Sequence, residues 1–184
     1  MEKINASWEK DGYILRLARK EDAESYYDHN FNPLDSDIAR FTGCKPVFTH
    51  DEVVGFFLSC VDDEDRYDFL LVDPEGNIVG ESVINEIDWN VKKANFRIAI
   101  FHADVREKGM GSWMVKVTRD FAFEQLQLHR LELNVFSFNQ RAEKAYLKAG
   151  FHREGVLKDA IKDGDNYADD ILMAILEDEW RKIK

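Results

Sequence analysis

The chain has few cysteines, and neither of them stands in a recognisable cysteine motif. Among its 184 residues only Cys44 and Cys60 are cysteines, too few for the disulfide framework of a small secreted domain. The sequence contains no Cys-x-x-Cys pair and no group of histidines and cysteines with metal-ligand spacing, so we expect no metal site. Low cysteine use is typical of a reducing compartment, and we expect a cytoplasmic protein.

Long apolar runs, targeting signals and linkers are also missing. No run approaches the roughly 20 apolar residues that a membrane helix needs. The first residues, Met1–Asn5, contain no apolar signal-peptide core, and no repeat, low-complexity segment or Pro/Gly-rich linker divides the chain. We therefore expect residues 1–184 to form a single domain with no membrane partner.

Positive charge is scarce relative to negative charge. The chain has 25 Lys and Arg residues against 36 Asp and Glu residues, a formal net charge of −11 at pH 7. Nucleic acids are bound through basic surfaces, so this balance argues against a nucleic-acid partner. An acidic surface raises the local concentration of cations, which is compatible with a cationic substrate, although many ordinary soluble proteins are equally acidic.

The first half of the chain changes from helical to strand patterns. A strand is predicted at 13–18, followed by helices at 20–29, at 36–41 and after the capping box that Thr49 forms with Glu52. Three further strands are predicted at 67–72, 78–88 and 95–101, with a Pro/Gly turn at 73–77. These three strands have the short connections of an antiparallel meander.

The second half predicts a crossover unit and a hairpin. A helix follows the turn at 106–112, and a cleanly alternating strand at 131–136 follows that helix. The strands on either side of this helix should be parallel and joined by a right-handed crossover. The remaining elements are a helix from the cap Asn139 to Ala149, hairpin strands at 156–161 and 167–176, and a terminal helix at 177–184. The pattern predicts a mixed sheet with helices on both faces.

Arg106–Ser112 is a basic turn with two glycines at a strand-to-helix junction. Glycines permit a positive φ and close approach to the backbone, and the first amides of a helix have no internal partners and lie at its positive end. Such a turn suits a phosphate or pyrophosphate. Ser112 stands where a P-loop has lysine, and Met114 where the dinucleotide fingerprint has its third glycine, so neither motif is present. A turn with no ligand is the alternative.

Two motifs and the order of elements resemble the GNAT superfamily of acetyl-CoA-dependent N-acetyltransferases. Residues 106–111, with the sequence REKGMG, resemble the family's R/Q-x-x-G-x-G/A pyrophosphate loop. Residues 139–151, with the sequence NQRAEKAYLKAGF, resemble its N-x-x-A-x-x-x-Y-x-x-x-G-F helix. The resemblance implies an α/β fold with a mixed, mostly antiparallel sheet and helices on both faces. It also implies a splayed parallel pair formed by the strands at 96–101 and 131–136.

The same resemblance implies acetyl-CoA as co-substrate. Its pantetheine arm would pair like an extra strand in the splay, and backbone amides near the end of the first strand would receive the thioester oxygen. The residues expected to bind it are Ile100, Phe101, Arg106, Glu107, Lys108, Gly109, Met110, Gly111, Ser112, Asn134 and Asn139.

The implied reaction is direct attack of an amine on the thioester. Tyr146 matches the family tyrosine that protonates the departing thiolate, although an aromatic that only packs on its helix is the alternative. Glu81 and Glu86 lie five residues apart and, without a bulge, face opposite sides of their strand, so only one of them can face the cleft. Glu86, nearer the strand's end, is favoured as base, and solvated strand residues are the alternative for both.

The acceptor is expected to be a primary amine on a small polycation, such as a polyamine or an aminoglycoside. The segment 31–43 should form part of its wall, because the matching loop does so in the family. The carboxylates expected to bind it are Asp35, Asp37, Glu52 and Glu81. The second half of the chain resembles the branch of spermidine and ribosomal-protein alanine acetyltransferases, so a peptide N-terminal amine is an alternative, as is a non-catalytic acetyl-CoA-binding module. A homodimer is compatible with the resemblance.

Overall fold

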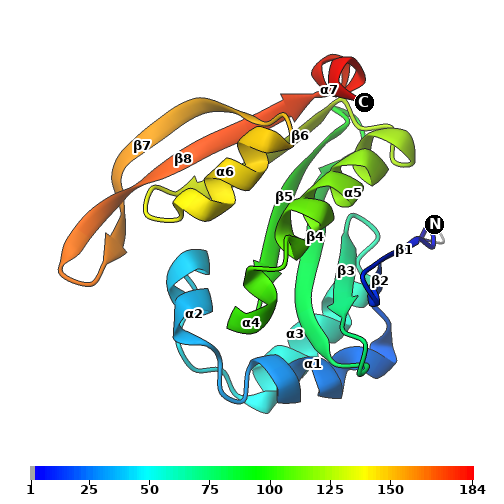
Figure 1. The fold of residues 1–184 in the computed structure, drawn as a ribbon, viewed down its shortest axis with the longest axis vertical. Helices are drawn as coiled ribbons and strands as arrows, with labels where there is room; N and C mark the ends of the chain where they lie inside the picture. Colours follow the sequence, from blue (N-terminus) through cyan, green and yellow to red (C-terminus); the bar gives the residue numbers. More distant parts are fainter. Residues whose placement is uncertain (1–2) are drawn as a thin grey trace.

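An eight-stranded sheet organises residues 3–184, the part of the chain that this computed structural model describes (Figure 1). Its strand order is β1-β2-β3-β4-β5-β6-β8-β7, and β5 and β6 form its one parallel pair within these residues. The strands are β1 (Ser7–Lys10), β2 (Tyr13–Leu17), β3 (Tyr67–Val72), β4 (Ile78–Asp88), β5 (Lys93–Ile100), β6 (Arg130–Phe136), β7 (His152–Asp163) and β8 (Asn166–Leu176).

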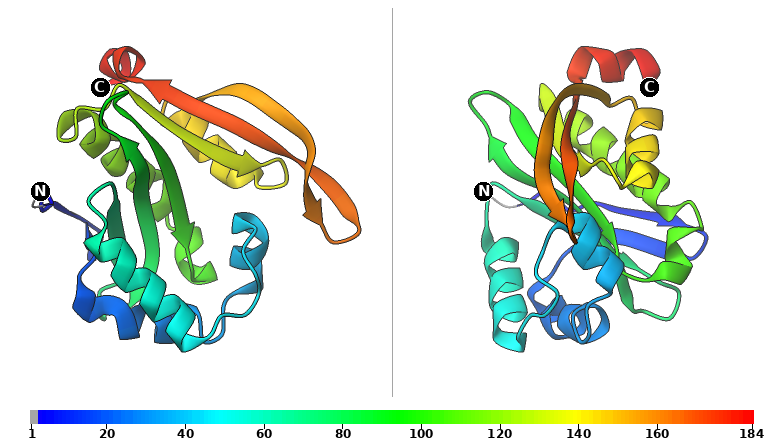
Figure 2. Two further views of the ribbon diagram at one scale, coloured as in Figure 1. Left: turned by 180° about the vertical axis from the view of Figure 1, so that it is seen from behind. Right: turned by 90° about the vertical axis from the view of Figure 1, so that its left-hand side faces the viewer.

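Helices lie on both faces of the sheet, as predicted (Figure 2). They are α1 (Ala23–Asn30), which follows a 3₁₀ turn at Lys20–Asp22, α2 (Ser36–Thr42), α3 (His50–Asp62), α4 (Ala103–Arg106), α5 (Met110–Glu124), α6 (Gln140–Lys148) and α7 (Glu177–Ile183). The predicted capping box begins α3, where Thr49 and Glu52 exchange side-chain to backbone hydrogen bonds. Each of these helices in residues 3–184 is too short or too polar to cross a bilayer.

Two apolar clusters fill the two faces of the sheet. On one face, α1 and α3 contribute residues such as Tyr26 and Phe57, which pack on Leu70 of β3. On the other face, α5 and α6 contribute residues such as Met114 and Tyr146, which join the larger cluster. The meander and the crossover therefore each bury an apolar side, and the sheet separates the two helical layers.

The parallel pair β5–β6 is splayed, which confirms the expectation from the sequence. Its register pairs residues 93–95 with residues 130–132 and continues no further. Beyond Asn95 and Glu132 the two strands diverge, so that they form a V whose closed end lies near α7 (Figure 1). The second halves of both strands therefore leave backbone groups on their facing edges without a sheet partner.

Three features of the fold differ from the sequence prediction. Strand β1 and the single turn α4 were not predicted, because each is only four residues long and too short to show a period. Strand β7 spans His152–Asp163 rather than 156–161. It is exposed along most of its length and has register shifts at Arg153/Gly155 and Leu157/Ile161, which remove the alternation that marks a strand.

Candidate active site

The open half of the V is lined by backbone groups of β5. The N–H of Phe101 donates to Val79 O of β4 at 2.9 Å. Backbone groups alternate sides along an antiparallel ladder, so the N–H of Ile100 points away from β4 and toward the gap. This corrects the expectation for Phe101, whose amide is already bonded, and leaves Ile100 as the amide that faces the gap.

The predicted pyrophosphate turn lies at the open end of the V, between α4 and α5. Gly109 caps α5 with φ 74°, and no atom lies within 4 Å of a Cβ added there, so the glycine is required by the backbone and leaves space for a ligand. Gly111 lies inside α5 and needs no positive φ. The side chain of Met110 is 1% exposed and belongs to the core, so it can offer only its backbone to a ligand.

Arg106 does not extend from the turn into solvent. Its Nε donates to Ile100 O at 3.0 Å and its Nη2 to Phe101 O at 3.2 Å. The guanidinium also lies 3.0 Å from Asp35 Oδ1 and 3.3 Å from Asp37 Oδ2. Only 14% of the side chain is exposed. These contacts run against the expectation that Arg106 supplies charge to a pyrophosphate.

Lys108 is the more accessible cation of the turn. Its Nζ donates to the Tyr13 hydroxyl at 3.1 Å and lies 5.7 Å from the centre of that ring. The hydrogen bond that the ammonium donates to Tyr13 raises the pKa of Lys108, so the group stays charged. Glu107 and Ser112 are exposed beside it.

Tyr146 lies behind the splay among aromatic rings. Its ring centroid is 6.2 Å from that of Phe96 on β5 and 5.9 Å from that of Phe151. The residue is 5% exposed, and within residues 3–184 its hydroxyl has no hydrogen-bond partner. Burial raises the pKa of this hydroxyl well above its usual range, so the phenol keeps its proton at neutral pH. A protonated hydroxyl without a protein acceptor suits a proton donor.

Both ends of α6 are fixed, which holds Tyr146 in place. The side chain of Asn139 accepts from the N–H of Ala142 at 3.3 Å, so its predicted cap role is confirmed. At the other end, buried Arg119 of α5 donates to Ala149 O at 2.5 Å. The following Gly150 has φ 90°, and an added Cβ would lie 2.3 Å from Ile183 Cδ1, so only glycine fits this turn.

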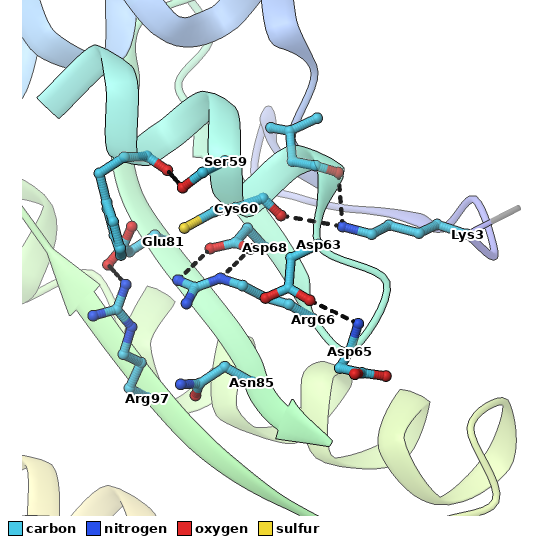
Figure 3. A network of polar contacts seen from close by, with 12 residues as sticks. Lys3, Ser59, Cys60, Asp63, Asp65, Arg66, Asp68, Glu81, Asn85 and Arg97 are labelled. Atoms are coloured by element: carbon cyan, nitrogen blue, oxygen red, sulfur yellow. Dashed lines mark hydrogen bonds and ion pairs between the residues drawn. The ribbon is translucent and has the colours of Figure 1, made fainter. Parts of the chain in front are cut away.

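The two strand carboxylates occupy different surroundings. Glu81 is 8% exposed and accepts from the Tyr26 hydroxyl at 2.6 Å. It also lies 3.4 Å from the Arg97 guanidinium (Figure 3). Glu86 is exposed, with φ 54° in a register shift between Asn85 and Asp88. It lies at the closed end of the V, because Asn85 pairs with Asn95 and the gap opens only after Asn95. This position argues against Glu86 as base.

The other predicted acceptor carboxylates already have partners in the chain. Asp35 and Asp37 face Arg106. Glu52 pairs with Lys45 and closes the Thr49 capping box, and the hydrogen bond from Lys45 lowers the pKa of Glu52 to about 2. The sequence did not show that these carboxylates would pair with cations of the same chain.

Helix α2 bridges the two arms of the V. Its first turn contacts Arg106 near the end of β5. Near its other end, Arg40 forms two 2.7 Å hydrogen bonds with Asp163 at the tip of the β7–β8 hairpin and lies 4.5 Å from the centre of the Phe138 ring. Figure 1 shows α2 between α4 and this hairpin. The segment 31–43 therefore closes the open side of the V, as expected of a wall.

One carboxylate in the β6–β8 arm is incompletely satisfied. Asn134 of β6 donates to Asp170 Oδ2 of β8 at 2.7 Å. Strand β8 pairs with the edge of β6 that faces away from the gap. Asp170 Oδ1 is the one buried side-chain oxygen or nitrogen without a partner in residues 3–184. Such an oxygen is costly unless it meets a donor, and a cationic nitrogen would be a suitable one.

Sequence reasoning missed Arg119, Asp170 and the ring of Phe96. Arg119 lies next to Asp120 in a helix that otherwise shows a clear apolar face, so a charge close to that face was the available signal. Asp170 interrupts the apolar part of a strand, which was a weaker signal. Phe96 resembles any core residue, and nothing in the sequence distinguishes its place beside the gap.

Comparisons with known proteins agree with this geometry. A model of the acetyltransferase (GNAT) domain matches residues 13–152. Spermidine N(1)-acetyltransferase of Vibrio cholerae is 26% identical over 166 residues, which cover 90% of this chain and 95% of that enzyme. The crystal structure of the V. cholerae spermidine N-acetyltransferase in complex with CoA and spermine has a TM-score of 0.82 at 25% identity and covers 94% of this chain and 99% of that one. Ribosomal-protein-S5-alanine acetyltransferase from Vibrio fischeri shares the fold, with a TM-score of 0.77 at 22% identity over 95% of this chain and 98% of that one.

Proposed function

We propose that this chain, which belongs to the GNAT acetyltransferase domain family, acetylates a primary amine of a small polycation such as a polyamine or an aminoglycoside. Membership makes it an acetyl-CoA-dependent N-acetyltransferase. The proposal concerns the acceptor and the residues that act on it.

The residues at the open end of the V fit acetyl-CoA, whose thioester supplies the acetyl group. The α5 N-terminus, with Gly109 and Gly111, would hold the pyrophosphate, and exposed Lys108 would add positive charge. The unpaired edges of β5 and β6 would hold the pantetheine amides. The Ile100 amide is placed to receive charge on the thioester oxygen.

Tyr146 would supply the proton that the leaving thiolate needs. A thiol of this kind has a pKa of about 8.5, so it departs more readily when a donor stands ready. The hydroxyl has no hydrogen-bond partner among residues 3–184, and it stays protonated. Loss of the amine proton is left to solvent in this proposal, because Glu81 is engaged by Tyr26 and Arg97, and Glu86 lies at the closed end of the V.

The observation that carries the acceptor class is the likeness to spermidine N(1)-acetyltransferase of V. cholerae, which extends over 90% of this chain. The net charge of −11 supports a cationic acceptor. The unpartnered Oδ1 of Asp170, in the β6–β8 arm of the site, supports it locally. A homodimer stays a prediction.

Two alternatives make different predictions. The alternative of a peptide N-terminal amine as acceptor is supported by the likeness to the S5-alanine acetyltransferase, and this likeness concerns the fold alone. A non-catalytic binding module would not need the unpartnered hydroxyl of Tyr146.

Thiol release from acetyl-CoA, measured with spermidine, a kanamycin-type aminoglycoside and peptides with varied N-termini, separates these readings. We expect release with a polycation and little with the peptides. Release only with peptides would refute the acceptor class, and binding of acetyl-CoA without release with any amine would favour the non-catalytic module.

A further inference from the structure

Arg106 belongs to the predicted cofactor turn, yet its side chain contacts another part of the molecule. All four of its acceptors lie outside the turn: two are carbonyl oxygens at the end of β5, and two are carboxylates in and next to α2. An arginine held by two carbonyls and two carboxylates has few donors left for a phosphate. Within residues 3–184, the exposed Lys108 forms no ion pair with a carboxylate, and no side chain caps the α5 N-terminus.

Asp35 has two functions at the start of α2. Its Oδ1 accepts from the N–H groups of Asp37 and Ile38 at 2.8 and 3.2 Å, so it caps the helix. The same oxygen lies 3.0 Å from Arg106 Nη2. Partial burial opposes charge on Asp35, but the hydrogen bonds from Arg106 and Ile38 hold the pKa of this carboxyl below its usual value. The helix start and the cofactor turn are therefore joined by a single oxygen atom.

Helix α2 has only seven residues, and its short length makes it dependent on such anchors. One residue of α2, Ile38, is buried. Its other polar anchor is Arg40 with Asp163 on the opposite arm of the V. Without Arg106, α2 would keep only the apolar packing of Ile38 with Ala99 and Phe101 on the β5 side, and the wall of the acceptor site would loosen.

We propose that Arg106 is a positioning residue that ties the cofactor turn to α2 and so orders the acceptor wall, rather than a ligand of the cofactor phosphates. The part that concerns the acceptor rests on the proposed function. The contact itself does not, and it can be tested without knowledge of the acceptor.

The test uses three variants of the full chain. Arg106→Gln removes the charge and the fork of donors. Asp35→Asn removes the charge but keeps a good helix cap, since asparagine caps as well as aspartate, and it is combined with Asp37→Asn. Lys20→Gln, which breaks the exposed ion pair with Asp62 far from the site, is the matched control. Hydrogen–deuterium exchange of peptides covering residues 35–43 reports on α2, and calorimetry reports the Kd of acetyl-CoA.

We expect exchange in α2 to rise at least about fivefold in Arg106→Gln and in the Asp35/Asp37 variant, with the Kd of acetyl-CoA within about threefold of the wild type. The control should change neither quantity. A Kd for acetyl-CoA raised more than about tenfold in Arg106→Gln would identify a phosphate ligand and overturn the proposal. Unchanged exchange in α2 would overturn it as well.

These outcomes are distinct from failure of the proposed function. A wild-type protein that binds acetyl-CoA but acetylates no polycation would refute the acceptor class and leave the α2 result standing. Where spermidine is turned over, its KM should rise about tenfold in Arg106→Gln, with kcat at saturating spermidine changed less. A fall in kcat with unchanged KM would count against a positioning role in the acceptor wall.

Discussion

Tyr146 is a buried residue with aromatic neighbours, and its hydroxyl has no hydrogen-bond partner in the described part of the chain. Asp170 Oδ1 is the one buried side-chain atom without a partner in residues 3–184, so the Tyr146 hydroxyl is not sealed from solvent, although the residue as a whole is only 5% exposed. Its ring contacts Phe96 on β5, beside the point where β5 and β6 separate. At the scale of one residue, this is the group that we propose as the proton donor.

Tyr146→Phe removes the proposed donor and keeps the ring. We predict that kcat with the best acceptor falls by about 10²-fold or more, because that is the usual contribution of a general acid, while the Kd of acetyl-CoA stays close to that of the wild type. Steady-state thiol release and calorimetry measure the two quantities. Tyr167→Phe, at an exposed tyrosine on β8, is the control, and an unchanged kcat in Tyr146→Phe would remove the acid role.

Gly109→Val tests the cofactor turn. Valine disfavours φ 74°, so the turn should reshape, and its branched side chain would fill space that the ligand needs. We predict that acetyl-CoA binding is lost in calorimetry while the variant still folds. Gly76→Val is the matched control, because Gly76 has φ 90° and equally open surroundings but lies in the β3–β4 turn. Equal affinity for acetyl-CoA in both variants would refute the turn assignment.

Most elements could be predicted because their residues are periodic or capped. Residues 67–72 and 78–88 were bounded correctly from alternation and the turn between them. The α3 start followed from the capping box of Thr49. Strand β1 and helix α4 could not be found, since four residues carry no period.

The sequence predicted the turn and the Asn139 cap, but it did not predict the partners of the side chains expected in the site. The motifs located the turn, the Asn139 cap and Tyr146. Arg106 and Asp37, however, are 69 residues apart, and only the folded chain brings them together. A positive residue in a phosphate motif and an acidic residue in an acceptor wall each suggested a ligand, whereas in the structure each meets the other.

At the scale of the elements, β3 carries a buried ion pair that the site does not use. Arg66 and Asp68 form two hydrogen bonds at 2.7 and 2.8 Å, with about a tenth of each side chain exposed (Figure 3). Burial raises the pKa of Asp68 although Arg66 opposes the rise. Breaking such a pair leaves one charge buried without compensation.

Arg66→Met should therefore lower the free energy of unfolding by about 3–5 kcal/mol, and Arg66→Met with Asp68→Leu should recover most of it. Urea unfolding measures both. Because the folded pKa of Asp68 lies above its unfolded value of about 3.9, its favourable contribution is complete below that value and is lost as pH rises through the folded pKa. The difference in unfolding free energy between the wild type and Arg66→Met should therefore shrink in acid. A difference that stays the same at every pH would contradict this.

His50 links α1 to α3 through an exposed contact. Its Nε2 lies 2.8 Å from Glu24 and its Nδ1 lies 3.0 Å from Asp51. The hydrogen bond with Glu24, and after it the one with Asp51, raises the pKa of the imidazole. The raised pKa means that its stabilisation is complete below about pH 6.5 and is lost as pH rises through the folded value.

We predict that the Tm of the wild type, measured at low salt, declines slightly across this window relative to His50→Gln. A difference between the two proteins that does not change with pH would show that the contact has no electrostatic part. High salt should reduce the effect, since the pair is exposed.

At the scale of the whole molecule, the proposed cofactor and acceptor regions lie on different sides of the splayed β5–β6 pair. The cofactor turn and α6 lie on the α5 side of the sheet, and α2 closes the side that faces the β7–β8 hairpin. Arg106 connects these two sides. The net charge of −11 favours approach of a cationic acceptor, and this steering should weaken as salt rises.

The most direct measurement is the ratio of kcat/KM for spermidine to that for a peptide with an N-terminal alanine, from thiol release out of acetyl-CoA at one ionic strength. We predict a ratio well above one, falling with added salt and with both rates reduced in Tyr146→Phe. A ratio below one, with robust acetylation of the peptide, would contradict a polycationic acceptor.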